Sequence, residues 1–222
     1  MLTYYSATRF LVGVVLGVVT GWRVTGRERI PPQGGLIVAS NHISFWDPPL
    51  VGSASSRGLY FLAKEELFRT PVLGPLIRAY HAIPIRRGMA DLSGMSRAID
   101  ILKRGEALLM FPEGSRMRDG ELHPARPGVG MMAVTAGVPI VPCYISGSNR
   151  SGDWWRRKTR VRISFGVPRT WQEFAGPDAD PTPGRVLYQR VSDAVMQEIG
   201  VLKTGQMTEA VRGAANRRSQ SS

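Results

Sequence analysis

Short apolar runs alternate with amphipathic segments along most of the 222-residue chain. Runs such as residues 36–40 and 107–111 have the length and composition of buried strands. Residues 91–103, by contrast, repeat apolar side chains at helical spacing, and Gly105 follows them as a stop signal. Strands that alternate with helices form a largely parallel sheet covered by helices. The pattern therefore predicts a single α/β domain with a largely parallel, mixed sheet flanked by helices.

Three parts of the chain are expected: an N-terminal membrane-associating helical segment at 1–23, the α/β domain at 24–202, and a polar, loose tail at 203–222. Ligand sites in parallel sheets form at the carboxyl ends of strands, and two polar motifs, at 40–48 and 111–116, follow expected strands. The expected strands are residues 36–40, 59–64, 82–85, 107–111, 139–144 and 161–165, and the expected helices are residues 71–80, 91–103, 129–136 and 185–198, with one more that begins at Asp47.

The N-terminal segment carries an apolar run, residues 10–22, between Arg9 and Arg23. A helix that spans a bilayer needs about 20 apolar residues, so this run is short. The aromatic residues Tyr4, Tyr5 and Trp22 suit the headgroup region of a membrane. The favoured interpretation is a helix that lies in one leaflet. The alternative is an apolar helix packed on the domain's own core.

The formal net charge is +12 and the isoelectric point is near 10.8, so the chain should seek anionic partners. Nucleic acid is the weaker choice, because no zinc-finger spacing and no basic stripe with interleaved aromatics is found. The single cysteine, Cys143, lies in an apolar run and is expected to be a buried core residue. No disulfide within the chain is possible, which suits a reducing compartment. The scattered histidines predict no metal site, and no cofactor is implied.

The first motif, SNHISFWDP at 40–48, contains His42 and Asp47. The two can face each other only if the chain turns between them, as a strand–turn–helix would make it do. A carboxylate on one imidazole nitrogen leaves the other nitrogen as a base. The alternative is that Asp47 merely caps the helix. Ser44 is close by, but G-x-S-x-G is absent, so the pair is expected to act on a substrate hydroxyl and an activated acyl donor such as a thioester.

The second motif, FPEGSR at 111–116, puts a glycine turn beside a carboxylate and an arginine. Gly114 allows the backbone to approach a ligand closely, and Arg116 can bind phosphate through two parallel hydrogen bonds. Glu113 can accept a hydrogen bond from a hydroxyl or orient Arg116. Arg86 and Arg87 add positive charge after the strand at 82–85. Taken singly, each arginine is also compatible with a solvated surface charge.

Four ordered blocks together resemble the glycerolipid acyltransferases, and most closely the bacterial 1-acyl-sn-glycerol-3-phosphate acyltransferases. The resemblance covers about residues 24–170, and its first and third blocks are the specific ones. The blocks are NHxSxxD at 41–47, AIPIRR at 82–87, FPEGSR at 111–116 and VPIVP at 138–142.

This resemblance implies a role for each matched residue. His42 would be the general base on the acceptor hydroxyl, with Asp47 as its orienting partner. The implied substrate-binding residues are Arg87, Glu113, Gly114, Ser115, Arg116 and Arg126. Arg126 stands where lysine is frequent in the family. Arg86 stands where an acidic residue is common, and His81 replaces a frequent glycine and would either crowd the pocket or be inert.

The resemblance implies an acyl transfer from acyl-CoA or acyl-carrier protein to the sn-2 hydroxyl of lysophosphatidic acid, which gives phosphatidic acid. Acylation of glycerol 3-phosphate or of another lysophospholipid is the alternative within the enzyme class. A non-catalytic module that binds anionic lipid is the alternative of another class. The expected location is the cytoplasmic face of the cell membrane, with monotopic or peripheral attachment to an anionic surface.

Overall fold

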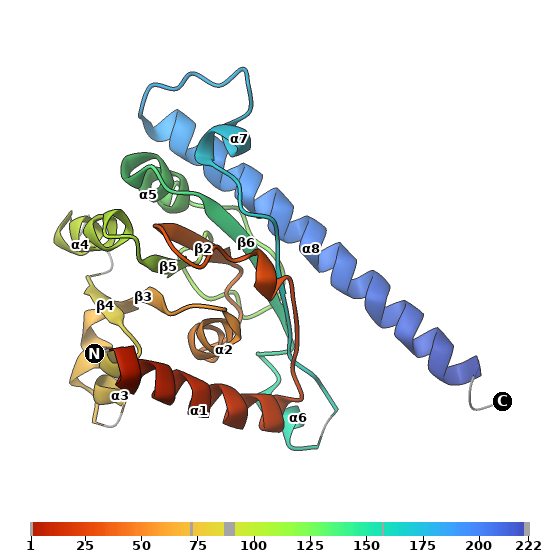
Figure 1. Cartoon of the computed structure of the whole chain (residues 1–222). Helices are drawn as coiled ribbons and strands as arrows, with labels where there is room; N and C mark the ends of the chain where they lie inside the picture. Colours follow the sequence, from red (N-terminus) through yellow and green to blue (C-terminus); the bar gives the residue numbers. More distant parts are fainter. Residues whose placement is uncertain (1, 72, 87–91, 157, 220–222) are drawn as a thin grey trace.

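The computed structural model describes residues 2–71, 73–86, 92–156 and 158–219. A seven-stranded sheet lies at its centre, in the order β1-β7-β6-β2-β5-β3-β4 (Figure 1). Neighbouring strands are parallel except β6 and β7, which confirms the largely parallel, mixed sheet. The strands are β1 Arg23–Thr25, β2 Leu36–Ser40, β3 Leu59–Lys64, β4 Ala82–Ile85, β5 Ala107–Met110, β6 Ile140–Ser146 and β7 Arg162–Phe165.

The two central strands explain the uninterrupted apolar runs in the sequence. Every residue of β2 and β5 is buried. Because successive side chains point to opposite faces of a sheet, Ile37 packs into one core and Val38 into the other. A strand that is covered on both faces has no solvent side and needs no polar alternation. Cys143 on β6 is fully buried, as expected, and burial raises the pKa of its thiol to about 12.

Helices cover both faces of the sheet (Figure 1). The core on one face receives side chains from α1, α2, α3 and α6, and the core on the other face receives them from α4, α5, α7 and α8. The helices are α1 Leu2–Thr20, α2 Asp47–Ala54, α3 Leu73–Ala79, α4 Leu92–Lys103, α5 Gly128–Ala136, α6 Ser151–Trp154, α7 Trp171–Ala175 and α8 Arg185–Ser219, with the 3₁₀ turns η1 Arg27–Arg29 and η2 Glu65–Arg69.

Helix α1 has one packed face and one exposed apolar face. It contacts α2 and α6, and Leu16 and Thr20 are buried there. The opposite face exposes five large apolar side chains: Phe10, Leu11, Val14, Val15 and Val18. No helix in the described residues is both long and apolar enough to cross a bilayer. Packing on the domain's own core accounts for the buried face of α1. A helix that lies in one leaflet would account for the exposed apolar face.

The C-terminal residues differ from the expected loose tail, because α8 continues as a helix to Ser219. Gln206 anchors this part of the helix, and only 5% of its surface is exposed. Its amide nitrogen donates to Ser164 Oγ at 2.8 Å, and its amide oxygen accepts from Ser146 Oγ at 2.8 Å. These hydrogen bonds to β6 and β7 hold the part of α8 around Gln206 against the sheet. This part is polar and shows no apolar periodicity from which a packed helix could be predicted. The helix then projects away from the domain (Figure 1).

The sheet also contains a strand that the apolar pattern did not predict. Residues 23–25 form β1, which pairs in parallel with β7 at the edge of the sheet. Arg23 and Thr25 are exposed and only Val24 is partly buried. A strand of three residues with one apolar side chain gives too little pattern to recognise from sequence.

Candidate active site

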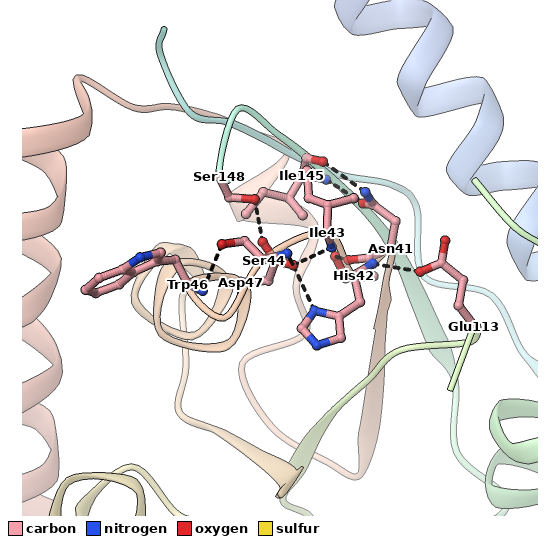
Figure 2. A network of polar contacts seen from close by, with 10 residues as sticks. Asn41, His42, Ile43, Ser44, Trp46, Asp47, Glu113, Ile145 and Ser148 are labelled. Carbon is pink, nitrogen blue, oxygen red and sulfur yellow. Dashed lines mark hydrogen bonds and ion pairs between the residues drawn. The ribbon is translucent and has the colours of Figure 1, made fainter. Parts of the chain in front are cut away.

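The two polar motifs meet at one edge of the sheet. Strands β2 and β5 are parallel neighbours, with Ala39 paired to Met110, so their carboxyl ends lie side by side. The backbone N–H of His42, two residues after β2, donates to Glu113 Oε2 at 2.8 Å (Figure 2). The topology therefore brings together residues that are 71 positions apart in the sequence.

His42 and Asp47 are paired as the strand–turn–helix interpretation predicted. His42 Nδ1 lies 2.8 Å from Asp47 Oδ2. Asp47 is the first residue of α2, yet its side chain makes no cap to the helix, because Trp46 occupies the cap position without a side-chain hydrogen bond. The Asp47 carboxylate instead accepts the backbone N–H groups of Ile43 and Ser44, each at 2.7 Å. The geometry thus favours the working pair over the simple cap.

Ser148 completes the surroundings of Asp47 and was missed in the sequence. Its hydroxyl donates to Asp47 Oδ1 at 2.5 Å, and both residues are fully buried (Figure 2). A fully buried carboxylate requires donors that compensate for the lost hydration. The available signal was a polar, glycine-containing segment, residues 147–152, directly after the β6 strand.

The ring of His42 is fixed in orientation. Phe111 stacks on it, with ring centroids 4.0 Å apart and planes 20° apart. The acceptor at Asp47 favours the tautomer that carries its proton on Nδ1, so that Nε2 keeps a lone pair. The side chain of His42 remains 12% exposed. A substrate hydroxyl can therefore reach an imidazole nitrogen that is oriented as a base.

The backbone of the His42 turn is held on three sides. The side-chain amide of Asn41 donates to the Ile145 carbonyl and accepts from the Ile145 N–H, at 3.0 and 2.8 Å, which joins the end of β2 to β6. The His42 carbonyl accepts from Met117 N at 2.7 Å, while its N–H donates to Glu113. The position of the imidazole is therefore determined by contacts to β6 and to residues 113–117 of the loop after β5.

Glu113 was expected to bind the acceptor or to orient Arg116, and its described partners are backbone groups. It is buried, and its two carboxylate oxygens accept the backbone N–H groups of His42 and His123. Burial raises the pKa of the Glu113 carboxyl above its ordinary value, although the hydrogen bonds from those two residues act in the opposite direction. The described contacts favour a role in positioning the His42 turn.

Arg116 lies over the ring of Phe45, which belongs to the first motif. The guanidinium carbon is 3.6 Å from the ring centroid, and Phe45 is 70% exposed. A guanidinium at this distance from an aromatic face is attracted by the ring quadrupole. The positive charge of the second motif is thereby placed beside the turn that carries His42. The sequence did not indicate a role for Phe45.

The FPEGSR turn brings Arg126 close, as the family resemblance implied. Gly114 has a φ of 71°, in the left-handed region that glycine tolerates. A Cβ atom at this position would lie 2.7 Å from Cδ of Arg126. Arg126 N donates to the Pro112 carbonyl at 2.8 Å. Glycine thus permits both the turn and the close approach, and Ser115 lies in the same turn.

The remaining candidates have other side-chain partners, lie at the other edge of the sheet or fall outside the described residues. Arg87 falls in the segment 87–91 that is not described, and Arg86 pairs with Glu65 at 2.7 Å. His81 precedes β4 at the amino end of that parallel strand, and therefore lies at the opposite edge of the sheet from His42. This position argues against crowding of the pocket. The ring of His123, which lies outside the four sequence blocks, pairs with Asp119 at 2.7 Å on the surface.

An imidazole oriented by a buried carboxylate removes a proton from a hydroxyl group. Among the residues that the structure describes, no group of three or more histidine, cysteine or acidic side chains could hold a metal ion. The fold and the site are those of an α/β enzyme in which a histidine is paired with a buried aspartate. The family model described as Acyltransferase matches residues 21–146, and the chain belongs to that family.

Two relatives and one solved structure are similar over much of the chain. A 1-acyl-sn-glycerol-3-phosphate acyltransferase of Bacillus subtilis is 28% identical over 191 residues, with 86% of this chain and 92% of that protein covered. A lyso-ornithine lipid O-acyltransferase of Pseudomonas aeruginosa is 32% identical over 157 residues, and the match covers 70% of this chain and 53% of that protein. The chain thus spans about half the length of the second relative.

The solved structure supports the same fold. The crystal structure of the 1-acyl-sn-glycerophosphate (LPA) acyltransferase PlsC from Thermotoga maritima matches with a TM-score of 0.65 and 26% sequence identity. The match covers 91% of this chain and 84% of that one. The likeness therefore includes both the sheet and most of the helices that cover it.

Proposed function

We propose that the protein transfers a fatty acyl group from a thioester to the sn-2 hydroxyl of 1-acyl-sn-glycerol 3-phosphate, which gives phosphatidic acid and a free thiol. The observation that carries this proposal is the 2.8 Å contact between His42 Nδ1 and a buried Asp47 carboxylate. The names of the Bacillus relative and the Thermotoga neighbour support the acceptor. A module that only binds lipid has no use for an imidazole oriented in this way.

The chemistry follows from the geometry of His42. Its Nε2 accepts the proton of the acceptor hydroxyl while the hydroxyl oxygen attacks the thioester carbonyl carbon. The Asp47 carboxylate stabilises the imidazolium that forms. As the tetrahedral intermediate collapses, the C–S bond breaks and the imidazolium returns its proton to the leaving thiolate.

The acceptor phosphate has to lie near the His42 turn, because only one carbon–carbon bond separates the sn-2 carbon from the sn-3 carbon that carries the phosphate. Arg116 lies over Phe45 on that turn and carries a charge suited to bind it. Arg126 lies against the neighbouring Gly114. Arg87, which the family resemblance adds to this set, would contribute from the segment after β4.

The proposed location is the cytoplasmic face of the cell membrane, with peripheral or monotopic attachment to an anionic surface. The exposed apolar face of α1 and the net charge of +12 support this location. An enzyme held at the bilayer meets an acceptor with an acyl tail more often than a soluble acceptor. The thioester donor is acyl-CoA or acyl-carrier protein, and both are anionic.

The acceptor is tested with purified protein, one acyl-CoA and a set of acceptors, with the products separated by chromatography. Lysophosphatidic acid should be acylated faster than glycerol 3-phosphate, and only the position next to the phosphate-bearing carbon should react. Faster acylation of glycerol 3-phosphate would refute the assignment. Absence of transfer to every acceptor, with vesicle binding intact, would favour the lipid-binding module.

A second candidate acceptor is a lysolipid with a different headgroup. The observation that favours it is the likeness to the lyso-ornithine lipid O-acyltransferase of Pseudomonas aeruginosa. The same assay includes lyso-ornithine lipid and lysophosphatidylcholine. If either reacts faster than lysophosphatidic acid, the phosphate monoester is not the group that the arginines select.

A further inference from the structure

An exposed tryptophan lies among basic side chains directly after α6. Trp155 is 77% exposed, although the preceding Trp154 is buried in the core. Three described basic residues that follow Trp155 are exposed, and Arg23 lies beside them because its N–H donates to the Val161 carbonyl at 2.9 Å. We name this set the α6 surface, and its members are Trp155, Arg23, Arg156, Lys158 and Arg160. Among the described residues, no carboxylate forms an ion pair with any of its four cations.

The α6 surface lies at the end of the exposed apolar face of α1. Helix α6 contacts α1 and lies beside its last turn (Figure 1). Gly21 N donates to Gly17 O at 2.9 Å, so Gly21 continues the helical hydrogen bonding. It follows Val18 by three residues and Val14 by seven, which places it on the same face of the helix as these valines. A Cβ atom on Gly21 would lie 3.9 Å from Cγ of Arg160. The apolar face of α1 therefore leads directly to the basic side chains.

Trp154 joins the α6 surface to the body of the domain and to the His42 turn. Its ring nitrogen donates to the Gly147 carbonyl at 3.0 Å. Its ring meets that of Trp46 edge-on, with centroids 5.7 Å apart. Trp46 belongs to the first motif and is 45% exposed. Exposed aromatic surface is thus present both at the α6 surface and on the turn that carries His42.

The combination of groups indicates the kind of partner. Tryptophan rings favour the headgroup region of a bilayer, and lysine and arginine at the border of an apolar helix are attracted to anionic lipids. An acidic protein would satisfy the charges but would leave the adjoining apolar side chains of α1 in water. We propose that the α6 surface is a second membrane contact, in which the cations bind the phosphate headgroups of anionic lipids and Trp155 enters the interface. It extends the proposed attachment beyond α1 and does not depend on the acyl transfer.

This contact has a consequence for the acceptor. Because Trp46 touches Trp154, a bilayer at the α6 surface lies close to the His42 turn as well. A lysolipid embedded in that bilayer then reaches the imidazole by a short path. Loss of the contact should lower turnover of a vesicle-embedded lysolipid and leave turnover of a short-chain, dispersed lysolipid unchanged.

The first test measures co-sedimentation of the full chain with vesicles of phosphatidylglycerol and phosphatidylcholine in equal amounts. Arg156→Gln with Lys158→Gln should weaken binding at least tenfold, since each cation near an anionic surface contributes about fivefold. Binding to pure phosphatidylcholine should not change. The matched control is Lys103→Gln with Arg185→Gln, which removes one exposed lysine from α4 and one exposed arginine from α8, on the other face of the sheet. An equal loss in both double variants would overturn the proposal, because net charge alone would then explain the effect.

The second test reports whether position 155 enters the interface. Trp155→Cys is labelled with a fluorophore whose emission depends on the polarity of its surroundings. Cys143 is fully buried and burial raises its pKa to about 12, so its thiol stays unlabelled. Emission should move to shorter wavelength on anionic vesicles. The same label on Val186→Cys, at an exposed position of α8, should not respond. An unchanged emission at position 155, on vesicles that bind the chain, would overturn the proposal.

This proposal and the proposed function fail in different ways, because vesicle binding is measured without donor or acceptor. Vesicle binding through the α6 surface, with no lysolipid acylated, would refute the proposed function and leave the membrane contact standing. Turnover of lysolipids, with vesicle binding unaffected by Arg156→Gln with Lys158→Gln, would refute the contact alone. If that variant loses affinity for an acidic protein, with acyl-carrier protein as the probe, and keeps its vesicle binding, the surface docks a protein and the proposal is overturned. Circular dichroism of each variant establishes that a lost affinity does not come from unfolding.

Discussion

At the scale of single residues, the site depends on one imidazole whose ring and backbone are both fixed. Asp47 accepts hydrogen bonds from the His42 ring, two backbone N–H groups and the Ser148 hydroxyl. Phe111 stacks on the ring, and Glu113 and Met117 bind the backbone of the same residue. Such preorganisation allows a base to act without first having to be ordered.

Replacement of the base is the most direct residue-level prediction. His42→Ala should lower turnover of lysophosphatidic acid by roughly 10²- to 10⁴-fold, the usual contribution of general-base catalysis. The protein should remain folded by circular dichroism, because the pair lies at the edge of the core. His123→Ala, at a surface histidine, is the matched control and should keep its activity. Near-normal turnover of folded His42→Ala would contradict the mechanism.

Ser148 is predicted to act as a positioning residue for Asp47. Ser148→Ala should lower kcat roughly tenfold to a hundredfold, as expected for the loss of a hydrogen bond to a charged group, with KM for the lysolipid little changed. Ser192→Ala is the control, since Ser192 is equally buried but accepts from Gly130 N on the other face of the sheet. A purely structural role would show equal loss of thermal stability in both variants and no difference in kcat.

Phe45 is predicted to hold Arg116 beside the turn. Phe45→Leu removes the aromatic face and should raise KM for lysophosphatidic acid about two- to fivefold, since an exposed cation–π contact contributes about 0.5 to 1 kcal/mol. Phe45→Tyr retains the ring and should behave as the unchanged protein. If Phe45→Leu instead lowers KM, the ring competes with the substrate for Arg116.

At the scale of elements, α1 divides its surface between the domain and the outside. Leu16 and Thr20 are buried, whereas Val14 and Val18 are exposed. Removal of the whole helix would therefore uncover part of the core as well as remove the exposed apolar face. Substitutions on the exposed face separate the two effects.

The exposed face of α1 is predicted to enter the lipid surface. Val14→Glu with Val18→Glu should weaken partitioning to vesicles at least tenfold, because two apolar contacts of about 1.5 to 3 kcal/mol are replaced by charges. The control is Val186→Glu with Val201→Glu, which changes two exposed valines on α8. Co-sedimentation with vesicles gives the bound fraction. An equal loss in both double variants would show that added negative charge, and not the α1 face, causes the effect.

At the scale of the whole molecule, the sheet order gathers motifs that are distant in the chain. His42 follows β2, Glu113 follows β5 and Ser148 follows β6, and these three strands are neighbours in the sheet. The net charge of +12 acts over the same molecule and favours anionic surfaces.

Ionic strength should separate the charge-driven part of membrane attachment from the apolar part. Exposed charges are screened beyond about 10 Å at 0.1 M salt and about 3 Å at 1 M salt. Binding to anionic vesicles should therefore fall as the salt concentration rises. The binding that remains at high salt should be weaker in the double variant Val14→Glu with Val18→Glu. Salt-independent binding to anionic and neutral vesicles alike would show that the net charge makes no contribution.

The sequence by itself determined the features that depend on local pattern. Apolar runs of strand length predicted the central strands, and the strand–turn–helix at residues 40–48 predicted the His42–Asp47 pair. These residues are five positions apart, so the turn alone brings them together. The family resemblance added Arg116 and Arg126, which the structure places in or against one turn.

The tertiary structure alone decided the contacts that join distant segments. Ser148 meets Asp47 across 101 positions, and Gln206 meets Ser146 across 60. The carboxylate of Glu113 meets the His42 backbone across 71 positions. The sequence shows that a side chain is polar, but it does not show whether water, a substrate or a buried backbone group is its hydrogen-bond partner. Only the packing of the sheet and helices determines which partner replaces water.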